Sequence, residues 1–345
     1  MKPLALPRSY NVQSPMPSTG PTELPYPPLS LIGRIGPMGD EDPVATYRET
    51  GQLHRELLTS VLPSDWSWGG KRVLDFGCGS GRMLRQFTPE ACDAEFWGCD
   101  LDASSVDWLQ ANFCPPFNVF HSSEAPGLPQ DDGFFDLIYA FSVYTHFTDN
   151  WAGWLLEHHR VLAEGGLLFA TFLGEGMLEP LTGEQWNEDT IGMNPLLHGY
   201  SWDLGGPIAI NSPWWIRTHW GRAFEIVELR PVIDEGVPSH GLVLARKKPV
   251  QLTVGDLARL EPNEPREILS LKHHAKQLAA ETVRLRVAHE AQSHQSARID
   301  SLEQELGQIR NSLSWQLTAP LRAAKRHMQR SREARGTRQR RTLQG

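Results

Sequence analysis

Hydrophobic and polar positions follow two periods along the middle of the chain. Short apolar runs predict strands near 72–76, 94–100, 117–121, 134–141 and 166–172. Helical spacing of apolar residues predicts helices near 80–88, 103–112 and 150–163, and an earlier one within TYRETGQLHRELLTSVL that packs beside the first strand. Because strands alternate with helices, we expect a parallel sheet with helices on both faces.

The pattern breaks after the fifth predicted strand. Residues 174–211 contain Gly, Pro and Trp with little periodicity, and we interpret them as an insertion over the carboxyl edge of the sheet, where ligands bind in such folds. A helix then starts in SPWWIRTHWG, with Ser212 as its cap and Pro213 at its first position. The stretches FEIVELRPV and GLVLARKK complete the sheet as an antiparallel pair. The pattern therefore predicts a doubly wound α/β fold with a seven-stranded, mostly parallel sheet.

Composition divides the rest of the chain. Residues 1–43 contain ten prolines, which fix backbone angles and remove amide donors, so we expect an extended, poorly ordered N-terminal segment. The folded domain is predicted over 44–248, followed by a linker over 249–265. A coiled-coil helix is predicted over 266–318, and a basic tail over 319–345.

The helix after residue 265 has a seven-residue repeat, which favours supercoiling against another helix. The repeat is formed by Leu271, Leu278, Leu285, Gln292, Ile299, Leu306 and Leu313, with Ala288, Leu302 and Ile309 in a second seam. Gln292 and Gln295 make the centre of the seam polar. We expect a homo-oligomer formed through this helix; the alternative is a single amphipathic helix docked on its own domain. Pro320 ends or kinks the helix.

Charge is distributed unevenly along the chain. Residues 320–345 contain nine Lys and Arg residues against one acid, Glu333, so this segment carries +8, and the remainder carries −16 because the net charge is −8. The tail suggests a peripheral contact with an anionic membrane, whereas the acidic body makes nucleic acid an unfavourable partner. No membrane-spanning run or signal peptide is apparent, so we expect a cytoplasmic protein. The four cysteines lack metal-ligand spacing, and no metal is expected.

The segment VLDFGCGSGR, residues 73–82, carries the clearest chemical signal. Gly77, Gly79 and Gly81 follow a strand and allow a ligand to approach the backbone. A dinucleotide fingerprint would read G-x-G-x-x-G, and Asp75 at this place would repel a pyrophosphate. A cationic ligand fits better, and S-adenosylmethionine carries an ammonium and a sulfonium but no phosphate. Asp100, which ends the next strand in FWGCDLD, can accept both hydrogens of a ribose diol.

Four ordered segments resemble a known family. VLDFGCGSGR, GCDLDASSVDWL, LPQDDGFFDLIYAFSVYTHF and HRVLAEGGLLFATF are similar to the motifs of class I S-adenosylmethionine-dependent methyltransferases. The resemblance covers residues 45–248 and implies a Rossmann-like sheet. The chain has Glu164-Gly165-Gly166 where the family usually has Pro-Gly-Gly, which leaves the cofactor site untouched.

The resemblance implies a set of cofactor-binding residues. They are Asp75, Gly77, Cys78, Gly79, Ser80 and Gly81 around the methionine portion, Asp100 at the ribose, Leu101 on the adenine, Ser122 and Ser123 at the adenine amino group, and Phe141 and Ser142 near the methionyl ammonium. Simpler roles stay open. The two aspartates could cap helices or turns, the serines could be loop residues, and Arg82 could close a helix start.

His146 is the candidate catalytic residue. It follows the fourth strand, where the resemblance places the departing methyl group, and histidine is readily poised as a base at neutral pH. A structural histidine is the alternative. Trp186, Trp202, Trp214, Trp215 and Trp220 could stack on sugars or lipophilic substrates, or fill the core.

The tail carries a second resemblance. SLSWQLTAPLRA, residues 312–323, is similar to a segment that follows coiled coils in bacterial enzymes of surface-polysaccharide assembly. This implies O-methylation of a sugar in a glycan. A small-metabolite or lipid acceptor, and an oligomeric scaffold with a methyltransferase-like binding module, are the alternatives.

Overall fold

The computed structural model describes residues 24–34, 42–197, 206–233 and 239–311. The chain divides into two units, residues 1–281 and 282–345. The first contains the sheet and the second contains most of the long C-terminal helix. Residue Trp202 and the predicted tail segment from 312 onward lie outside the described residues.

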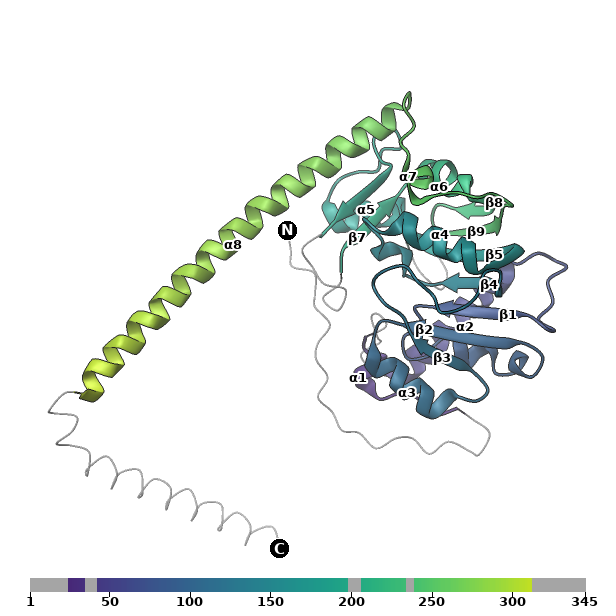
Figure 1. The fold of residues 1–345 in the computed structure, drawn as a ribbon, viewed down its shortest axis with the longest axis horizontal. Helices are drawn as coiled ribbons and strands as arrows, with labels where there is room; N and C mark the ends of the chain where they lie inside the picture. The colour runs from purple at the N-terminus through teal and green to yellow at the C-terminus, as the bar shows by residue number, and fades with distance from the viewer. Residues whose placement is uncertain (1–23, 35–41, 198–205, 234–238, 312–345) are drawn as a thin grey trace, which may run out of the picture. The chain divides into compact units, whose positions relative to one another are not determined.

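A nine-stranded sheet organises the first unit (Figure 1). Its strands are β1 (Arg72–Phe76), β2 (Glu95–Asp100), β3 (Asn118–His121), β4 (Phe135–Ala140), β5 (Leu162–Leu173), β6 (Met193–Leu196), β7 (Ile208–Asn211), β8 (Phe224–Arg230) and β9 (His240–Lys247). Strands β3, β2, β1, β4 and β5 are parallel in that order. Strand β9 pairs antiparallel with β5, and β8 pairs antiparallel with β9. The predicted doubly wound α/β fold is confirmed.

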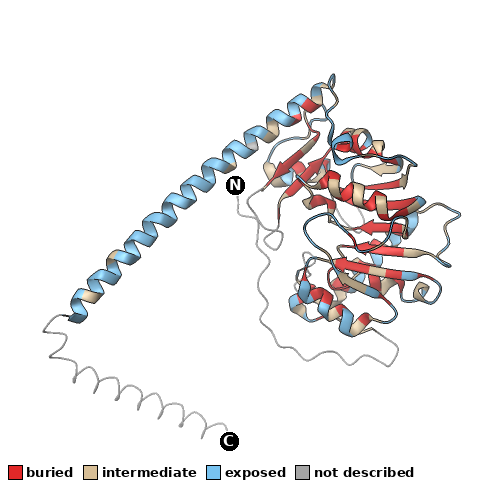
Figure 2. Cartoon of the chain, viewed as in Figure 1, coloured by how far each residue is buried: buried red, intermediate tan, exposed pale blue. Residues whose placement is uncertain are grey.

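Helices cover both faces of this sheet. In chain order, the described α-helices are α1 (Leu29–Ile32), α2 (Pro43–Val61), α3 (Ala103–Phe113), α4 (Trp151–Val161), α5 (Glu175–Thr182), α6 (Pro213–His219), α7 (Val254–Ala258) and α8 (Pro265–Asn311). Helices α2, α3, α4 and α6 pack against the sheet, whereas most of α8 belongs to the second unit. Successive strand residues point to opposite faces, so Leu74 packs in a core with α4 and α6, whereas Val73 packs in a second core with α2 and α3. Figure 2 shows the buried strands between these layers.

The insertion over 174–211 contains more regular structure than its sequence predicted. It begins with α5 and continues as the hairpin of β6 and β7, which are antiparallel. Strand β7 joins β5 at Leu173 and Ile210. Strand β9 already occupies the other side of β5 at Leu173, so β7 takes the side that β4 leaves open beyond Ala170. The hairpin thus extends the carboxyl edge of the sheet, and the sheet has nine strands rather than seven.

The helix predicted over 80–88 is wrong. These residues form turns followed by the short 3₁₀ helix η1 (Leu84–Phe87). The reason is the backbone of Gly81, whose φ of +85° is incompatible with a right-handed helix. Pro89 follows closely, and too few residues remain between these two positions for a stable α-helix.

Two segments that we expected to be loose are packed where they are described. In the proline-rich N-terminal part, Leu31 and Ile32 are buried, and Arg34 Nη1 lies 2.9 Å from Asp102 Oδ1. In the predicted linker, α7 starts with a capping box between Thr253 and Asp256, and its Leu257 is fully buried. Proline content and short length concealed this packing in the sequence.

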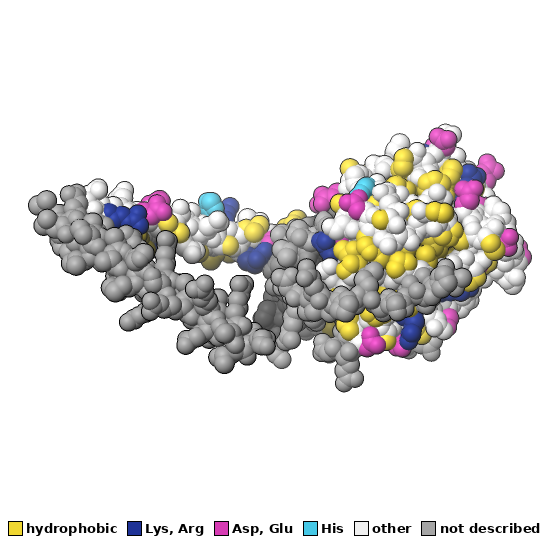
Figure 3. All heavy atoms as spheres, turned by 90° about the horizontal axis from the view of Figure 1, so that it is seen from below, with side chains coloured by type: hydrophobic (Ala, Val, Ile, Leu, Met, Phe, Trp, Pro, Cys, Tyr) yellow, Lys and Arg dark blue, Asp and Glu magenta, His cyan; other side chains and the backbone are white. Residues whose placement is uncertain are grey.

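The start of α8 is fixed within the first unit by buried polar contacts. Glu267 Oε1 accepts from His219 Nε2 at 2.8 Å, and Ser270 Oγ lies 2.8 Å from Asn194 Oδ1 of β6. From residue 282 onward, the described part of α8 is almost entirely exposed (Figure 2). Figure 3 shows hydrophobic, acidic and basic side chains together along this helix. Within the described residues, no helix is long and apolar enough to cross a membrane.

Candidate functional site

The glycine loop after β1 is the tightest backbone of the site. Gly77, Gly79 and Gly81 have φ values of +79°, +51° and +85°, a region that L side chains rarely adopt. A Cβ at Gly77 would lie 2.3 Å from Cγ2 of Val143. The Gly77 amide donates to the carbonyl of Cys99 at 2.9 Å, which ties the loop to β2. The loop therefore needs glycine for both conformation and space.

Asp75 is the last residue but one of β1 and places a buried carboxylate beside this loop. It is 3% exposed, and its Oδ2 has no hydrogen-bond partner among the described residues. Burial, together with the negative charge of Asp100, raises the pKa of Asp75 well above its usual value. The nearby Tyr139 hydroxyl and the Arg82 guanidinium lower that pKa, but burial dominates. The Tyr139 hydroxyl makes no hydrogen bond to Asp75 or to another described residue. Asp75 Oδ2 is therefore left to accept a hydrogen bond from a ligand, and a cationic donor would suit it.

The rest of the loop is held from helix α2. The Tyr47 hydroxyl donates to the carbonyl of Ser80 at 3.0 Å inside the core. Ser80 itself is fully buried, and its Oγ has no hydrogen-bond partner in the described part of the chain. Cys78 is buried against Gly98 of β2, so its side chain belongs to the core and only its backbone can contact a ligand. Burial lowers the pKa of Arg82, and the negative charge of Asp75 opposes this shift.

Asp100 ends β2 with both carboxylate oxygens oriented by the backbone. Its Oδ2 accepts from the Gly79 amide at 2.7 Å, and its Oδ1 accepts from the Asp102 amide at 2.8 Å. A carboxylate has about four acceptor positions, so two remain for a vicinal diol. Burial raises the pKa of Asp100, and the two amides oppose that rise. The structure thus places Asp75 and Asp100 on either side of one glycine loop.

Three predicted residues line the other end of this region. Leu101 is 37% exposed, which leaves its side chain available for a flat ring. The Ser122 amide donates to the Asp100 carbonyl at 3.0 Å, so this residue follows the site closely. Ser123 is different, because its hydroxyl donates to the Ala125 carbonyl at 2.7 Å within a local turn. That contact favours the interpretation of Ser123 as an ordinary loop residue rather than a ligand for the adenine amino group.

Phe141 and Ser142 continue from β4. The Phe141 ring stacks on His54, with centroids 4.4 Å apart, so its side chain belongs to the core. Ser142 has φ of +58°, an unusual value for a residue other than glycine. Its amide donates to Thr171 Oγ1 at 2.7 Å, and its carbonyl accepts from Thr145 Oγ1 at 2.7 Å. The chain therefore turns sharply at the carboxyl edge, and such strain is concentrated at functional sites.

His146 lies in the 3₁₀ helix η3 (Tyr144–His146) immediately after this turn. Its Nδ1 is 2.9 Å from the carbonyl oxygen of Pro207, just before β7. A carbonyl can only accept, so Nδ1 carries the proton and Nε2 keeps its lone pair. Burial lowers the pKa of His146, while the Pro207 contact opposes the shift. The imidazole is consequently neutral at pH 7 and able to accept a proton at Nε2.

The sequence did not identify several residues that shape the site. Tyr139 faces Asp75, and Pro207 orients His146 across 61 residues of sequence. His240 begins β9 opposite Leu173, with its Nε2 3.4 Å from Ser142 Oγ. No motif surrounds His240, and only the antiparallel direction of β9 brings it to the carboxyl edge. The sequence predicted that the last two strands are antiparallel to each other, but not that β9 is antiparallel to β5, so His240 was missed.

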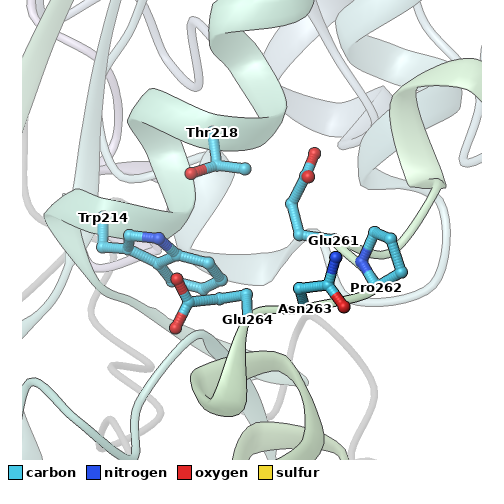
Figure 4. A pocket seen from close by; sticks show the side chains of 6 residues that line it. All are labelled: Trp214, Thr218, Glu261, Pro262, Asn263 and Glu264. Carbon is cyan, nitrogen blue, oxygen red and sulfur yellow. The ribbon is translucent and has the colours of Figure 1, made fainter.

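A separate hollow of about 390 Å³ lies between α6 and the segment before α8. Figure 4 shows Trp214 and Thr218 facing Glu261, Asn263 and Glu264 across it. None of the predicted cofactor residues lines this hollow. Its acidic side chains are paired, since Glu261 accepts from Arg222 and Glu264 accepts from Arg266. The hollow is therefore separate from the site at the sheet edge.

The candidate tryptophans are mostly structural where they are described. Trp215 and Trp220 are buried, and Trp186 packs against a small core of α5 and the hairpin. Trp214 is partly buried beneath the Arg266 guanidinium, 4.6 Å from its ring centroid. Among the described residues, no group of three or more His, Cys, Asp or Glu side chains is arranged to hold a metal ion.

Comparison with other sequences gives the same region a family context. Residues 74–170 match a family model described as a methyltransferase domain. Phthiotriol/phenolphthiotriol dimycocerosates methyltransferase 1 of Mycobacterium ulcerans is 30% identical over 150 residues, which cover 43% of this chain and 49% of that protein. The 27-O-demethylrifamycin SV methyltransferase of Amycolatopsis mediterranei is 30% identical over 145 residues, covering 41% and 50% respectively. The chain spans about half the length of these relatives.

Among solved structures, an S-adenosylmethionine-dependent methyltransferase from Mesorhizobium loti aligns with 20% identity and a TM-score of 0.44, covering 56% of this chain and 96% of that one. A SAM-dependent methyltransferase from Methanosarcina mazei aligns with 18% identity and a TM-score of 0.40, covering 55% and 96%. The family model matched by residues 74–170 covers the end of β1, the glycine loop, β2 and β4. Residues 74–170 therefore carry the sequence features of a methyltransferase domain.

Proposed function

We propose that this chain is an S-adenosylmethionine-dependent methyltransferase. The observation that carries the proposal is the buried Oδ2 of Asp75 beside the glycine loop, which has no hydrogen-bond partner in the part of the chain that the structure describes. A buried carboxylate without a partner is costly, and a cationic ligand offsets that cost. The ammonium of the methionine portion fits this place, and the match of residues 74–170 to a methyltransferase domain supports it.

The residues around the loop suit the remaining parts of this cofactor. Ser80 Oγ, which has no partner within the described residues, offers a second polar contact near the methionine portion. The free acceptor positions of Asp100 suit the ribose hydroxyls, and the exposed face of Leu101 suits the adenine ring. When bound, S-adenosylmethionine supplies a methyl group activated by the positive sulfonium. The glycines allow the ligand to lie directly against the backbone.

His146 acts as the general base in this proposal. Its Nε2 accepts the proton of an acceptor hydroxyl, while Nδ1–H remains fixed on the Pro207 carbonyl. Transfer of a methyl group from a sulfonium depends mainly on alignment, and a positioned base adds to it by making the acceptor oxygen more nucleophilic. Ser142 and His240 lie on the same edge and help to shape the acceptor side.

We propose the hydroxyl of a sugar in a surface glycan as the acceptor. The segment SLSWQLTAPLRA is the support for a glycan, and the +8 tail would bring the enzyme to an anionic membrane surface in the cytoplasm. Acceptors of lipid or small-metabolite type are the second candidate. The two relatives favour them, because one is named for phthiotriol and phenolphthiotriol dimycocerosates and the other for 27-O-demethylrifamycin SV.

The test is transfer of a radiolabelled methyl group from S-adenosylmethionine to two acceptor panels. One panel contains nucleotide sugars and oligosaccharides, and the other contains hydroxylated lipids and small polyketides. Labelling confined to the sugars supports the glycan proposal, and labelling confined to the second panel replaces it with the second candidate. A protein that binds the cofactor and labels neither panel favours a binding module within an oligomeric scaffold.

A further inference from the structure

Among the described residues from 282 onward, α8 presents a row of exposed apolar side chains. Leu285, Ile299, Leu302, Leu306 and Ile309 are 41% to 51% exposed. In a seven-residue repeat lettered a to g, Leu285, Gln292, Ile299 and Leu306 take position a, and Ala288, Gln295, Leu302 and Ile309 take position d. Such a seam is the surface that packs in a coiled coil.

The charges beside the seam select the partner and its direction. In a parallel, in-register pair, position g of one helix faces position e five residues further along the other. Arg298 at g then faces Glu303 of the second copy, and Glu305 at g faces Arg310. Both combinations are attractive, and the two-fold symmetry doubles them to four. These four side chains are exposed, so they are available for such pairing.

The reversed arrangement is less complementary. In an antiparallel pair centred on the two glutamines, Gln292 faces Gln295 of the other copy, and positions g face each other. Among the charged residues beside the seam, Glu305 then meets Arg284, whereas Arg298 meets Ala291. Symmetry gives two attractive pairs instead of four. We therefore propose that residues 282–311 form a parallel, in-register homodimeric coiled coil, an interaction surface independent of methyl transfer.

The polar centre is consistent with this arrangement. In the in-register pair, Gln292 lies opposite Gln292 of the second copy, and Gln295 lies opposite Gln295. Each side-chain amide can then both donate to and accept from its counterpart. Polar residues within an apolar seam lower the stability of a coiled coil while they fix its register. Slipping the helices by one repeat would place these amides against apolar residues.

Charge variants of the full chain test the partner and the direction together. The pair Glu303→Arg and Glu305→Arg makes all four flanking positions basic, and the pair Arg298→Glu and Arg310→Glu makes them all acidic. We expect sedimentation equilibrium to show a wild-type dimer and a dissociation constant raised about tenfold or more in each variant alone. Mixing the two variants should restore the dimer. Because the mixed dimer must form from folded helices, its recovery also excludes misfolding as the cause.

Other results would overturn the proposal. A wild-type chain that stays monomeric would favour the alternative in which the helix docks on its own domain, and a trimer would contradict the dimer. An acidic variant that dimerises as well as wild type would indicate the antiparallel arrangement, because that arrangement retains the pairing of Glu305 with Arg284.

Disulfide formation measures the direction independently. In a Cys92→Ser background, which removes the exposed native thiol, Ile309→Cys should cross-link two copies on oxidation. In the antiparallel pair, Ile309 would face Leu278 of the second copy. The two residues at position 309 would then lie about 46 Å apart along the axis, too far for a disulfide bond. Gln304→Cys, on the outer face at position f, is the matched control. Cross-linking at 304 but not at 309 would contradict the parallel seam.

Discussion

His146 Nδ1 lies 2.9 Å from the carbonyl oxygen of Pro207, so the hairpin added after α5 orients the candidate base. The two residues are far apart in sequence, and β7 brings them together by pairing with the end of β5. This contact fixes the tautomer of the imidazole and leaves Nε2 as the proton acceptor. The position of the hairpin therefore contributes directly to the proposed chemistry.

The pH dependence of methyl transfer follows from the pKa of His146. Burial lowers that pKa below 6.5, so the side chain stays neutral as the pH falls to slightly acidic values. We expect kcat to be constant near pH 7 and to fall only at a pH below the usual histidine range, as His146 becomes protonated. His146→Gln should lower kcat by about 10²- to 10⁴-fold, with cofactor affinity retained.

The control for this variant is His294→Gln, an exposed histidine on the outer face of α8. It should leave the pH profile unchanged. If His146→Gln kept the wild-type kcat and the same acid limb, His146 would be a structural histidine and the base would have to be sought elsewhere.

Asp75→Asn should stabilise the protein without cofactor and abolish cofactor binding. The pKa of Asp75 is raised in the folded state, so any stabilisation by this group is present below its unfolded pKa and is lost as the pH rises through the folded pKa. At higher pH the wild type carries a buried charge that asparagine avoids. We expect a gain of about 1 kcal/mol, or about 2–4 °C in Tm.

Thermal unfolding of both proteins across a range of pH checks this prediction. The difference in Tm should narrow as the pH falls and Asp75 takes up a proton. A variant that is less stable than wild type at every pH would mean that the carboxylate supports the fold, and the unpartnered oxygen would then lose its functional meaning.

Gly81→Ala should be strongly destabilising because conformation and space act together. A Cβ there would lie 2.6 Å from Cδ2 of Leu109 and 2.8 Å from the Phe113 ring, at a φ of +85°. Gly70 is the matched control, since its φ is +72° but its Cβ would meet nothing within 4 Å. We expect a loss of about 1 kcal/mol for Gly70→Ala and about 3 kcal/mol or more for Gly81→Ala in chemical denaturation. Equal losses of unfolding free energy in the two variants would show that α3 can shift to accommodate the added methyl group.

Glu267 anchors the start of α8 through two acceptor contacts. It accepts from His219 Nε2 at 2.8 Å and from the Glu261 amide at 3.2 Å. Glu267→Leu would leave the buried His219 Nε2 without its partner and remove the acceptor of the partly buried Glu261 amide, so we expect a loss of about 3 kcal/mol in unfolding free energy and faster proteolysis between α7 and α8. Glu267→Gln keeps an acceptor oxygen and should lose less than half as much. A Glu267→Leu variant as stable as wild type would show that the contact between Glu267 and His219 does not anchor the start of α8.

The strands of the first unit were predictable because their apolar runs are short and bounded by turns. Strand β1 was placed at 72–76 as observed, and the final antiparallel pair was also recovered. The helix over 80–88 failed because periodicity does not register the positive φ at Gly81. The hairpin of β6 and β7 was missed because buried Pro195 and Asn194 interrupt its apolar pattern.

The candidate site was only partly accessible from sequence. Asp75 and Asp100 could be named because each ends a predicted strand beside the glycines. Their environment could not be named, since the acceptor contacts of His146 and the packing of Tyr139 depend on segments that meet only in the fold. The side chains of Cys78 and Phe141 point into the core, which a linear motif does not reveal.

Calorimetric titration of S-adenosylmethionine into the wild-type protein and an Asp100→Ala variant measures whether the site beside the glycine loop binds this cofactor. We predict saturable binding to the wild type and its loss in the variant, because the ribose would have no carboxylate to hold it. Asp107→Ala, which removes an exposed carboxylate from the outer side of α3, is the control and should bind as wild type. A folded wild-type sample, free of copurified cofactor, that shows no binding would contradict the account.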